Sequence, residues 1–263
     1  MAMRAVLRVL LALLPKRKLT RLAGWLCDQS FSRYAIPVYI MLYHIDREEI
    51  DLPIVMYPTL NAFFARKVKR DVLSTALDAQ MICSPCDGIV LQVGTIDDQI
   101  RLPVKKMTIS VAELLGVAMA NAYLDGFYAI IYLSPRDYHR FHAPFACEID
   151  AVRTIAGGYD PVNRLGRMAN EALYARNTRI VFEGHQAGKR FALIAVGSLM
   201  VGSVKIASSL QGALPQVVQC GEEMGYFQFG STVILLLDRF FDPIALDQEQ
   251  RVYCREVFGQ KVR

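Results

Sequence analysis

The chain has 263 residues, enough to bury one substantial hydrophobic core, and 53% of them are hydrophobic. Its net charge of +5 belongs to the N-terminus, because six of the 30 basic residues precede the first acidic residue, Asp28. The rest of the chain is nearly neutral, which argues against a nucleic-acid-binding surface on the main domain and indicates an anionic partner for the first segment.

That first segment has the composition of a membrane-surface helix. Residues 5–14 are apolar apart from Arg8, and Pro15 and a Lys-Arg-Lys cluster follow. Ten residues are too few to span a bilayer, which takes about 20, and residues 15–18 offer no small-residue cleavage site of a secretory signal. We interpret the segment as a basic amphipathic helix lying on anionic lipid. The alternative is a structural helix packed on the domain.

The remaining pattern predicts mixed α and β structure without βαβ alternation. Ser110 and Glu113 form a capping box for a helix that reaches about Met119. Strand-forming runs occur at 89–93, 127–133, 148–155, 179–183, 190–207 and 228–237. We expect an α+β fold with N-terminal helices and a mainly antiparallel β core. Residues 1–50 would be the membrane-associating helical region and residues 51–263 the catalytic domain.

Residues 222–237 carry the most informative pattern. Gly230-Ser231-Thr232 follows an aromatic-rich segment and precedes a run of strand-forming residues. A serine hydroxyl held against the carbonyl carbon of the preceding glycine can attack its own peptide bond, and glycine permits the strained backbone that this needs. The dipeptide alone is weak evidence, because Gly197-Ser198 and Gly202-Ser203 also occur in an apolar run, where such pairs commonly mark bends or bulges.

Two further segments supply the groups that such a serine needs. Residues 134–144 contain His139 and His142, two of only four histidines, and residues 84–90 contain Asp87 in an Asp-Gly turn. Taken alone, His142 is typical of a core histidine and Asp87 of a turn former. On a strand the two histidines would face opposite ways, and only in a turn or helix would they converge.

Together these blocks resemble the phosphatidylserine decarboxylase family, of the shorter bacterial membrane-associated type. The resemblance runs from about Leu19 to about Asp238, and several independent blocks occur in the family's order. The further matching blocks are Leu19–Trp25, Leu60–Arg66, Tyr174–Arg179 and Val201–Val204.

The resemblance implies a chemistry and a role for each site residue. The chain would cleave itself between Gly230 and Ser231, and Ser231 would become a pyruvoyl group, the covalent cofactor. His142 would take the serine proton, Asp87 would orient and charge that imidazole, and His139 is a candidate proton donor. The pyruvoyl group would form a Schiff base with phosphatidylserine, and loss of carbon dioxide would give phosphatidylethanolamine. No metal or diffusible cofactor is implied.

The resemblance also implies partners and a location. The chain would be a zymogen of phospholipid biosynthesis whose cleaved large and small chains remain associated, as a homodimer, peripherally at the cytoplasmic side of the cell membrane. Two departures stand out: Cys220 occupies the place where the family usually has a lysine, and the link from Val204 to Gly221 is short. We expect both to affect headgroup contacts more than self-cleavage.

The six cysteines do not predict a metal site. Cys83 and Cys86 have the spacing of a zinc knuckle or redox pair, but Cys27, Cys147, Cys220 and Cys254 are scattered singly. Because a zinc site would need two more ligands and the chain shows no secretory signal, we interpret the cysteines as mostly buried thiols.

Two other classes of function remain as alternatives. An ordinary Ser/His/Asp hydrolase fits poorly, because Gly230-Ser231-Thr232 lacks the Gly-x-Ser-x-Gly elbow and leads into a strand. A non-catalytic membrane-binding module that has lost maturation is disfavoured by the presence of Asp87, His142, Gly230 and Ser231. Fragment formation would separate these alternatives, since a hydrolase stays intact.

Overall fold

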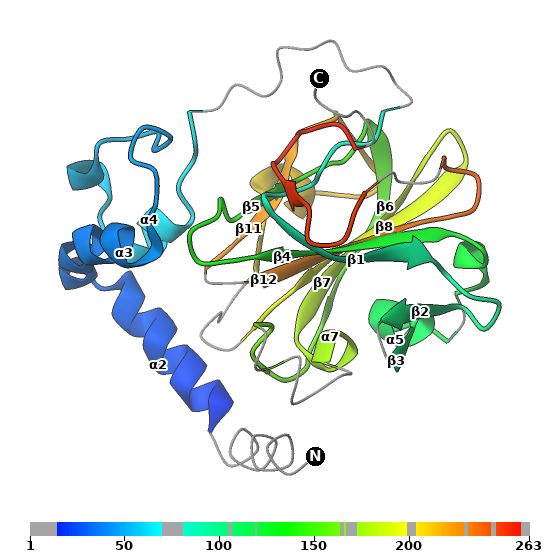
Figure 1. The fold of residues 1–263 in the computed structure, drawn as a ribbon, viewed down its shortest axis with the longest axis horizontal. Coiled ribbons are helices and arrows are strands. Elements are labelled where there is room, and N and C mark those ends of the chain that lie inside the picture. The colour runs from blue at the N-terminus through cyan, green and yellow to red at the C-terminus, as the bar shows by residue number, and fades with distance from the viewer. Residues whose placement is uncertain are drawn as a thin grey trace.

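N-terminal helices lie beside a β core in the computed structural model of the protein (Figure 1). The structure describes residues 15–69, 81–104, 107–118, 120–163, 166, 173–198, 204–228, 231–242 and 246–258. The helices of the N-terminal region are α2 (Lys16–Asp28), η1 (Ser30–Ala35), α3 (Ile36–Tyr43), η2 (Ile54–Met56) and α4 (Leu60–Phe64), where η denotes a 3₁₀ helix. No helix in these ranges is long and apolar enough to cross a membrane. The apolar segment 5–14 lies outside the described residues.

An eight-stranded antiparallel sheet forms the core, in the order β10-β6-β7-β8-β12-β4-β1-β13. These strands are β1 (Gly88–Thr95), β4 (Phe127–Leu133), β6 (Cys147–Ile155), β7 (Arg179–Gln186), β8 (Lys189–Val196), β10 (Gln216–Val218), β12 (Ser231–Leu237) and β13 (Arg251–Val252). The predicted α+β class with N-terminal helices and a mainly antiparallel core is confirmed.

Smaller elements surround this sheet. A three-stranded sheet contains β5 (Arg140–His142), β11 (Glu223–Phe227) and β9 (Val204–Ile206), and a hairpin contains β2 (Arg101–Val104) and β3 (Met107–Ser110). The remaining helices are α5 (Val111–Leu115), η3 (Asn121–Tyr123), α7 (Leu173–Arg176) and η4 (Ser208–Gln211).

Two of the predicted elements are shorter than expected. The run 190–207 does not form one strand, because β8 ends at Val196 and β9 belongs to another sheet. Ser110 does cap α5, accepting a hydrogen bond from the Glu113 N–H at 3.3 Å. The helix ends at Leu115 instead of near Met119, because Gly116 takes a left-handed φ of 65° that terminates helices.

The central strand β12 separates two apolar clusters. Val233 and Leu235 pack into the cluster that contains Phe141 of β5 and Phe227 of β11. Ile234 and the other inward residues of the opposite face pack against α5, η3 and α7. All seven residues of β12 are buried, and full burial of one aliphatic side chain contributes about 1.5–3 kcal/mol. The strand is therefore held firmly between β8 and β4.

The N-terminal helices have an apolar cluster of their own, formed around Ile36, Ile40 and Phe63. This helical region contacts the core at the loop between β4 and β5. There the Tyr39 hydroxyl donates to the Pro135 carbonyl at 2.8 Å. The helical region thus packs beside the segment that carries both predicted site histidines.

Candidate active site

Ser231 lies where the ends of three strands meet. It is the first residue of β12 and is paired with Leu133, the last residue of β4. On the other side of β4, Ile89 of β1 is paired with Tyr132. Because Asp87 directly precedes β1, Asp87 and Ser231 flank the same end of β4.

The histidines reach the same place through the pairing of β5 with β11. Glu223 lies opposite His142, and the Phe227 N–H donates to the His139 carbonyl at 2.9 Å. Only three residues separate Phe227 from Ser231, and two of them, Phe229 and the predicted scissile Gly230, lie outside the described residues. The fold therefore brings the serine, both histidines and the aspartate to one end of the sheet.

The Ser231 hydroxyl is fully buried, and its Oγ has no hydrogen-bond partner among the described residues. Alternation along β12 directs this side chain toward the face covered by β5 and β11, and directs Thr232 toward the opposite face. A buried polar group without a partner costs about 1–3 kcal/mol. By contrast, the Ser198 hydroxyl of the other described Gly-Ser pair accepts a hydrogen bond from the Val162 N–H at 3.2 Å. This hydroxyl therefore holds a neighbouring segment in place.

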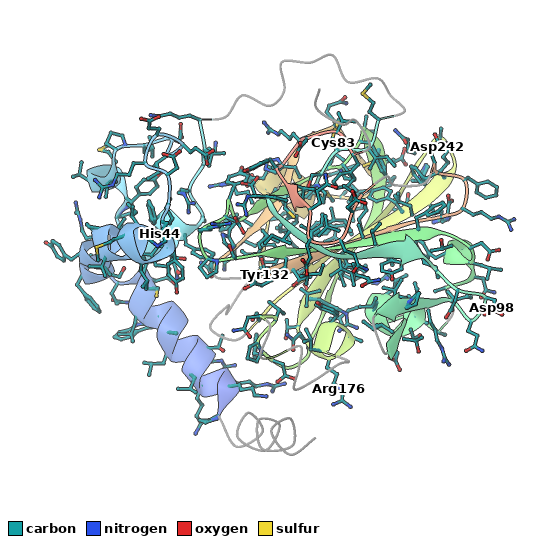
Figure 2. The ribbon with its side chains drawn as sticks, in the orientation of Figure 1. His44, Cys83, Asp98, Tyr132, Arg176 and Asp242 are labelled. Atoms are coloured by element: carbon teal, nitrogen blue, oxygen red, sulfur yellow. The ribbon has the colours of Figure 1, made fainter. Side chains whose placement is uncertain are left out.

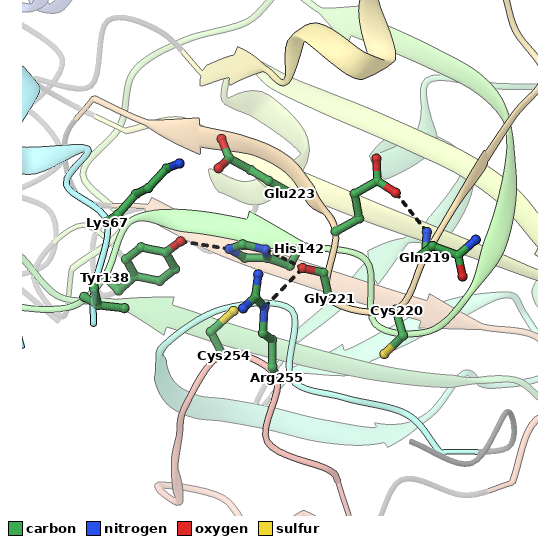
Figure 3. A pocket seen from close by; sticks show the side chains of 11 residues that line it. Lys67, Tyr138, His142, Gln219, Cys220, Gly221, Glu223, Cys254 and Arg255 are labelled. Carbon is green, nitrogen blue, oxygen red and sulfur yellow. Dashed lines mark hydrogen bonds between the residues drawn. The ribbon is translucent and has the colours of Figure 1, made fainter. Parts of the chain in front are cut away.

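Both ring nitrogens of His142 are hydrogen-bonded (Figure 3). Nδ1 lies 2.9 Å from the Gly221 carbonyl and Nε2 lies 3.0 Å from the Tyr138 hydroxyl. A carbonyl only accepts, so Nδ1 carries the hydrogen and Nε2 accepts from Tyr138. Burial lowers the pKa of His142 to about 3, and the positive charge of Arg255 acts in the same direction. The ring is therefore neutral at neutral pH.

Gly221 lies in a tight turn that requires glycine. The Glu222 N–H donates to the Gln219 carbonyl at 3.0 Å, and Gly221 has a φ of 73° at the third position, the arrangement of a type II turn. The Gly221 carbonyl accepts from His142 and also from Arg255 Nε at 3.1 Å. The turn thereby fixes the orientation of the His142 ring.

His139 occupies a different environment, against α4. Its Nδ1 lies 2.7 Å from the Asp137 carbonyl, and its ring packs on Phe64 with centroids 3.9 Å apart. Because Nδ1 donates to that carbonyl, Nε2 carries no hydrogen and can accept a proton. Nε2 is buried and has no hydrogen-bond partner among the described residues. Burial lowers the pKa of His139 to about 3, assisted by the charge of Arg66. The environments of the two histidines are thus distinct.

Asp87 is buried beside the C-terminal segment. Its Oδ1 accepts a hydrogen bond from the Cys254 N–H at 2.8 Å. Two residues earlier, the Pro85 carbonyl accepts from the His142 backbone N–H at 2.8 Å, which connects β5 to this segment. The contact through which Asp87 would orient the His142 ring stays a prediction.

Two charged residues that the sequence did not predict hold the loop between β4 and β5. Asp137 Oδ2 accepts from the N–H and hydroxyl of Ser134, both at 2.7 Å, and Asp137 Oδ1 bonds to Arg251. Arg66 is buried and donates to the Arg136 carbonyl at 2.9 Å, and burial lowers its pKa. Both lie inside blocks that carry the family resemblance, and that position is the signal that could have identified them.

Two cavities adjoin this region. The first, of about 510 Å³, opens beside His142 (Figure 3) and is lined by Lys67, Tyr138, His142, Cys220, Gly221, Glu223, Cys254 and Arg255, among others. The second, of about 850 Å³, lies between the helical region and the segment around η4. Its polar lining includes Asn61, Lys67, Arg140, Ser208, Glu223 and Gln228. Gln228 is three residues before Ser231.

Potential metal ligands gather elsewhere. Within the described ranges, one group of three ligand atoms lies within 4.8 Å of one another, formed by Glu148, Asp150 and His185 on β6 and β7. Arg190 lies 3.8 Å from Asp150 and already supplies a positive charge there. No such group includes the cysteines of the described residues.

Comparisons with known proteins identify the family of the chain. A family model for phosphatidylserine decarboxylase matches residues 60–260. A phosphatidylserine decarboxylase proenzyme of Brevibacillus brevis is 38% identical over 243 residues, covering 86% of each chain. The proenzyme of Geobacillus kaustophilus is 35% identical over 84% of this chain and 82% of its own. The Bacillus subtilis proenzyme is 31% identical over 98% of this chain and 97% of its own. The chain belongs to the phosphatidylserine decarboxylase family.

Proposed function

We propose that the protein decarboxylates phosphatidylserine to phosphatidylethanolamine after cleaving itself between Gly230 and Ser231. The observation that carries this proposal is the fully buried Ser231 hydroxyl, which lacks a partner among the described residues at the start of a central strand. The word proenzyme in the names of the relatives supports a processed precursor.

The cleavage step balances without an added reagent other than water. Ser231 Oγ attacks the Gly230 carbonyl carbon, and the amide becomes an ester with the proton passed to the new amine. Loss of the Ser231 α-proton then expels the Gly230 carboxylate. The resulting dehydroalanine takes up water and releases ammonia, which leaves the pyruvoyl group at the head of the small chain.

We assign the base of this step to His142. Its ring is neutral at neutral pH, so it can accept the serine proton. Because the Tyr138 hydroxyl occupies Nε2, it has to turn away before that nitrogen can act. His139 holds a bare buried Nε2, and we assign it the later proton transfer during decarboxylation. The role of Asp87 would be to support the charge on His142.

The surroundings of Ser231 suit a pyruvoyl group. Such a group supplies a carbonyl that condenses with the substrate amine and withdraws electrons as carbon dioxide leaves. Burial of Ser231 between β8 and β4 keeps water away from this position. The cavity of about 850 Å³ that reaches Gln228 offers cations and carboxylates of the kind that would bind a charged headgroup.

After cleavage, the two chains would remain associated. Residues 231–237 form β12 in the interior of the sheet, and β13 pairs with β1. Three hydrogen bonds that involve side chains also join residues 231–263 to residues 1–230. They connect Cys254 to Asp87, Arg255 to Gly221 and Arg251 to Asp137. Breaking one peptide bond leaves all of these interactions in place.

The helical region is proposed to dock on anionic lipid. It exposes a group of large apolar side chains, which are Leu19, Leu22, Trp25, Leu26, Phe31, Tyr34, Val38, Met41, Leu42, Leu52, Val55 and Met56. An exposed apolar group of this extent, with the exposed basic residues Arg17, Lys18 and Arg21 on the same helix α2, has the character of a membrane-surface element. The cytoplasmic-side location and the homodimer stay predictions.

Intact mass measurement of the purified protein tests the proposed cleavage. We expect two species: residues 1–230, and a small chain that is lighter by one ammonia than the peptide beginning with unmodified Ser231. Ser231→Ala should give one uncut chain. Thr232→Val is the matched control, because it removes a neighbouring buried hydroxyl that faces the opposite side of β12, and it should still be cut. A single uncut species from folded wild-type protein would overturn the proposal.

A further inference from the structure

Two cysteines that are distant in the sequence come into contact beside the site. Cys83 Sγ and Cys220 Sγ lie 3.6 Å apart, although 137 positions separate them. In the sequence only Cys83 and Cys86 have the spacing of a redox pair, and that spacing gives no indication of a contact with Cys220. The contact partner of Cys83 is the cysteine that replaces the family's usual lysine.

Backbone hydrogen bonds hold both cysteines against the same segment. The Cys83 N–H donates to the Pro144 carbonyl at 2.8 Å, and Cys83 forms a β-bridge with Val257. On the other side, the N–H of Gly221, which follows Cys220, donates to the Ala143 carbonyl at 2.8 Å. The fold therefore places the backbones of the two cysteines on either side of residues 143–144, where their sulfurs can meet.

The pair has the exposure that an oxidation site needs. Cys220 is partly exposed and lines the cavity of about 510 Å³, so a small oxidant can reach it, whereas Cys83 is fully buried. The hydrogen bond between the two thiols lowers the pKa of Cys220; burial opposes this shift, and the charge of Arg255 adds to it. By contrast, burial raises the pKa of the Cys147 thiol, which makes that cysteine less reactive. Because the thiolate is the reactive form, Cys220 is the favoured nucleophile.

We propose that Cys83 and Cys220 are a dithiol that hydrogen peroxide oxidises reversibly to a disulfide. The Cys220 thiolate attacks one peroxide oxygen, so that an S–O bond forms, the O–O bond breaks and hydroxide leaves. The Cys83 sulfur then displaces hydroxide from that sulfenic acid, and the S–S bond forms. In total, two thiols and one peroxide give one disulfide and two waters, and the two electrons lost by sulfur reduce the peroxide.

The geometry permits this closure. A disulfide has sulfurs about 2.05 Å apart, so the gap must close by roughly 1.5 Å, within reach of side-chain rotation and a small shift of the turn at Cys220. Both cysteines belong to residues 1–230, so the bond would not link the two chains that self-cleavage produces. It would join the segments on either side of Ala143 and Pro144, and would hold the turn whose Gly221 carbonyl accepts from His142.

Thiol mapping of the full, purified protein tests this proposal. The reduced protein is treated with graded hydrogen peroxide, remaining thiols are blocked with N-ethylmaleimide, and unreduced peptides are identified by mass. We expect two of the six thiols to escape blocking and a linked peptide pair whose fragmentation assigns Cys83 and Cys220. Treatment with a dithiol reductant should restore both thiols.

Two variants sharpen the mapping. Cys220→Ser should abolish the linked pair, and because this side chain is partly exposed, its loss should be tolerated by the fold. Cys147→Ser is the matched control and should retain the pair. Should either variant fail to fold, the wild-type map decides alone. Linkage of Cys83 to Cys86 or Cys254, or a Cys220 that is still blocked at the dose that oxidises other thiols, would overturn the proposal.

Discussion

The helical region and the β core differ in the exposure of their apolar side chains. Twelve of the fifteen exposed large hydrophobic side chains of the described residues lie between Leu19 and Met56, whereas the central strands β8 and β12 bury every apolar residue of their inner runs. Figure 2 shows this difference, with side chains projecting outward from the helices around His44 and filling the interior of the sheet around Tyr132. The exposed apolar surface of the described residues is therefore concentrated in the helical region.

The two regions contact each other at the loop between β4 and β5. From the helical side, Phe64 packs on the His139 ring and Arg66 donates to the Arg136 carbonyl. In addition, Arg140 Nε donates to the Ala65 carbonyl at 2.9 Å. The helical region, part of which is proposed to lie on lipid, therefore contacts a proposed site residue directly. The comparison predicts that chemistry and lipid binding can be removed separately.

The largest expected effect belongs to the core. His142→Ala and Asp87→Asn should each slow self-cleavage by about 10²–10⁴-fold, because positioned general-base catalysis supplies that factor. The measurement is the fraction of uncut chain over time by denaturing electrophoresis. His185→Ala, which removes a partly exposed histidine on β7, is the control and should be cut at the wild-type rate. Lipid binding by all three should be normal.

Tyr138→Phe refines the same prediction. Removing the hydroxyl frees His142 Nε2 without changing the packing of the ring beside it, which stacks with the imidazole at 5.7 Å between centroids. We expect cleavage at the wild-type rate or faster, measured as above. A block as severe as that of His142→Ala would show that the Tyr138 hydroxyl is part of the proton path.

His139→Ala should separate the two stages of the chemistry. Because His139 contacts α4 rather than the turn that carries Gly221, the precursor should still be cut, while decarboxylation of phosphatidylserine should fall by about 10²-fold or more. Release of labelled carbon dioxide from the carboxyl-labelled substrate measures the second stage. Normal decarboxylation in this variant would remove His139 from the proposed mechanism.

These tests concern residues that the sequence and the structure reveal to different degrees. The strand Phe127–Leu133 was predicted with its observed bounds, since an uninterrupted apolar run bounded by turn residues has few alternatives. The hydrogen bond from His142 to the Gly221 carbonyl could not be predicted, because Gly221 is 79 positions away and meets the ring only through the pairing of β5 with β11. The division of the chain at residue 50 stays a prediction.

Lipid binding should depend on the helical region alone. Replacing Trp25, Phe31 and Met41 with Glu should weaken binding to phosphatidylglycerol-containing vesicles by at least about tenfold, because burial of each such side chain contributes about 1.5–3 kcal/mol. Val217→Glu and Phe240→Glu are matched controls. Both side chains are similarly exposed, but they lie on the β-sheet part of the molecule and not in the helical region. Self-cleavage should survive in every variant. Trp25 is the only tryptophan, so its emission reports insertion directly in the wild type.

Deleting residues 1–18 should remove part of this binding, since it takes away five of the six basic residues that precede Asp28, together with the apolar residues of the segment 5–14. Each charge near an anionic surface contributes about 1 kcal/mol, and salt screens that contribution. Co-sedimentation at low and high salt separates the charge contribution from the apolar one. Equal binding by the truncated and full-length proteins would place the contact entirely within the helices that follow.

The smallest expected effect is a pH dependence of stability that arises from the two buried histidines. Burial lowers the pKa of His139 and His142 to about 3 in the folded protein, whereas an unfolded histidine titrates near 6.5. Between these values the unfolded chain binds more protons, so the free energy of unfolding should fall as the pH falls from 7 to 5, by about 2 kcal/mol for each ring. Urea unfolding of the uncut Ser231→Ala protein measures this slope. Adding His139→Gln should halve it, and adding His185→Gln should leave it in place because both buried rings remain. A midpoint that does not change between pH 7 and pH 5 would show that neither ring is held neutral by the packing of α4 and the Gly221 turn around it.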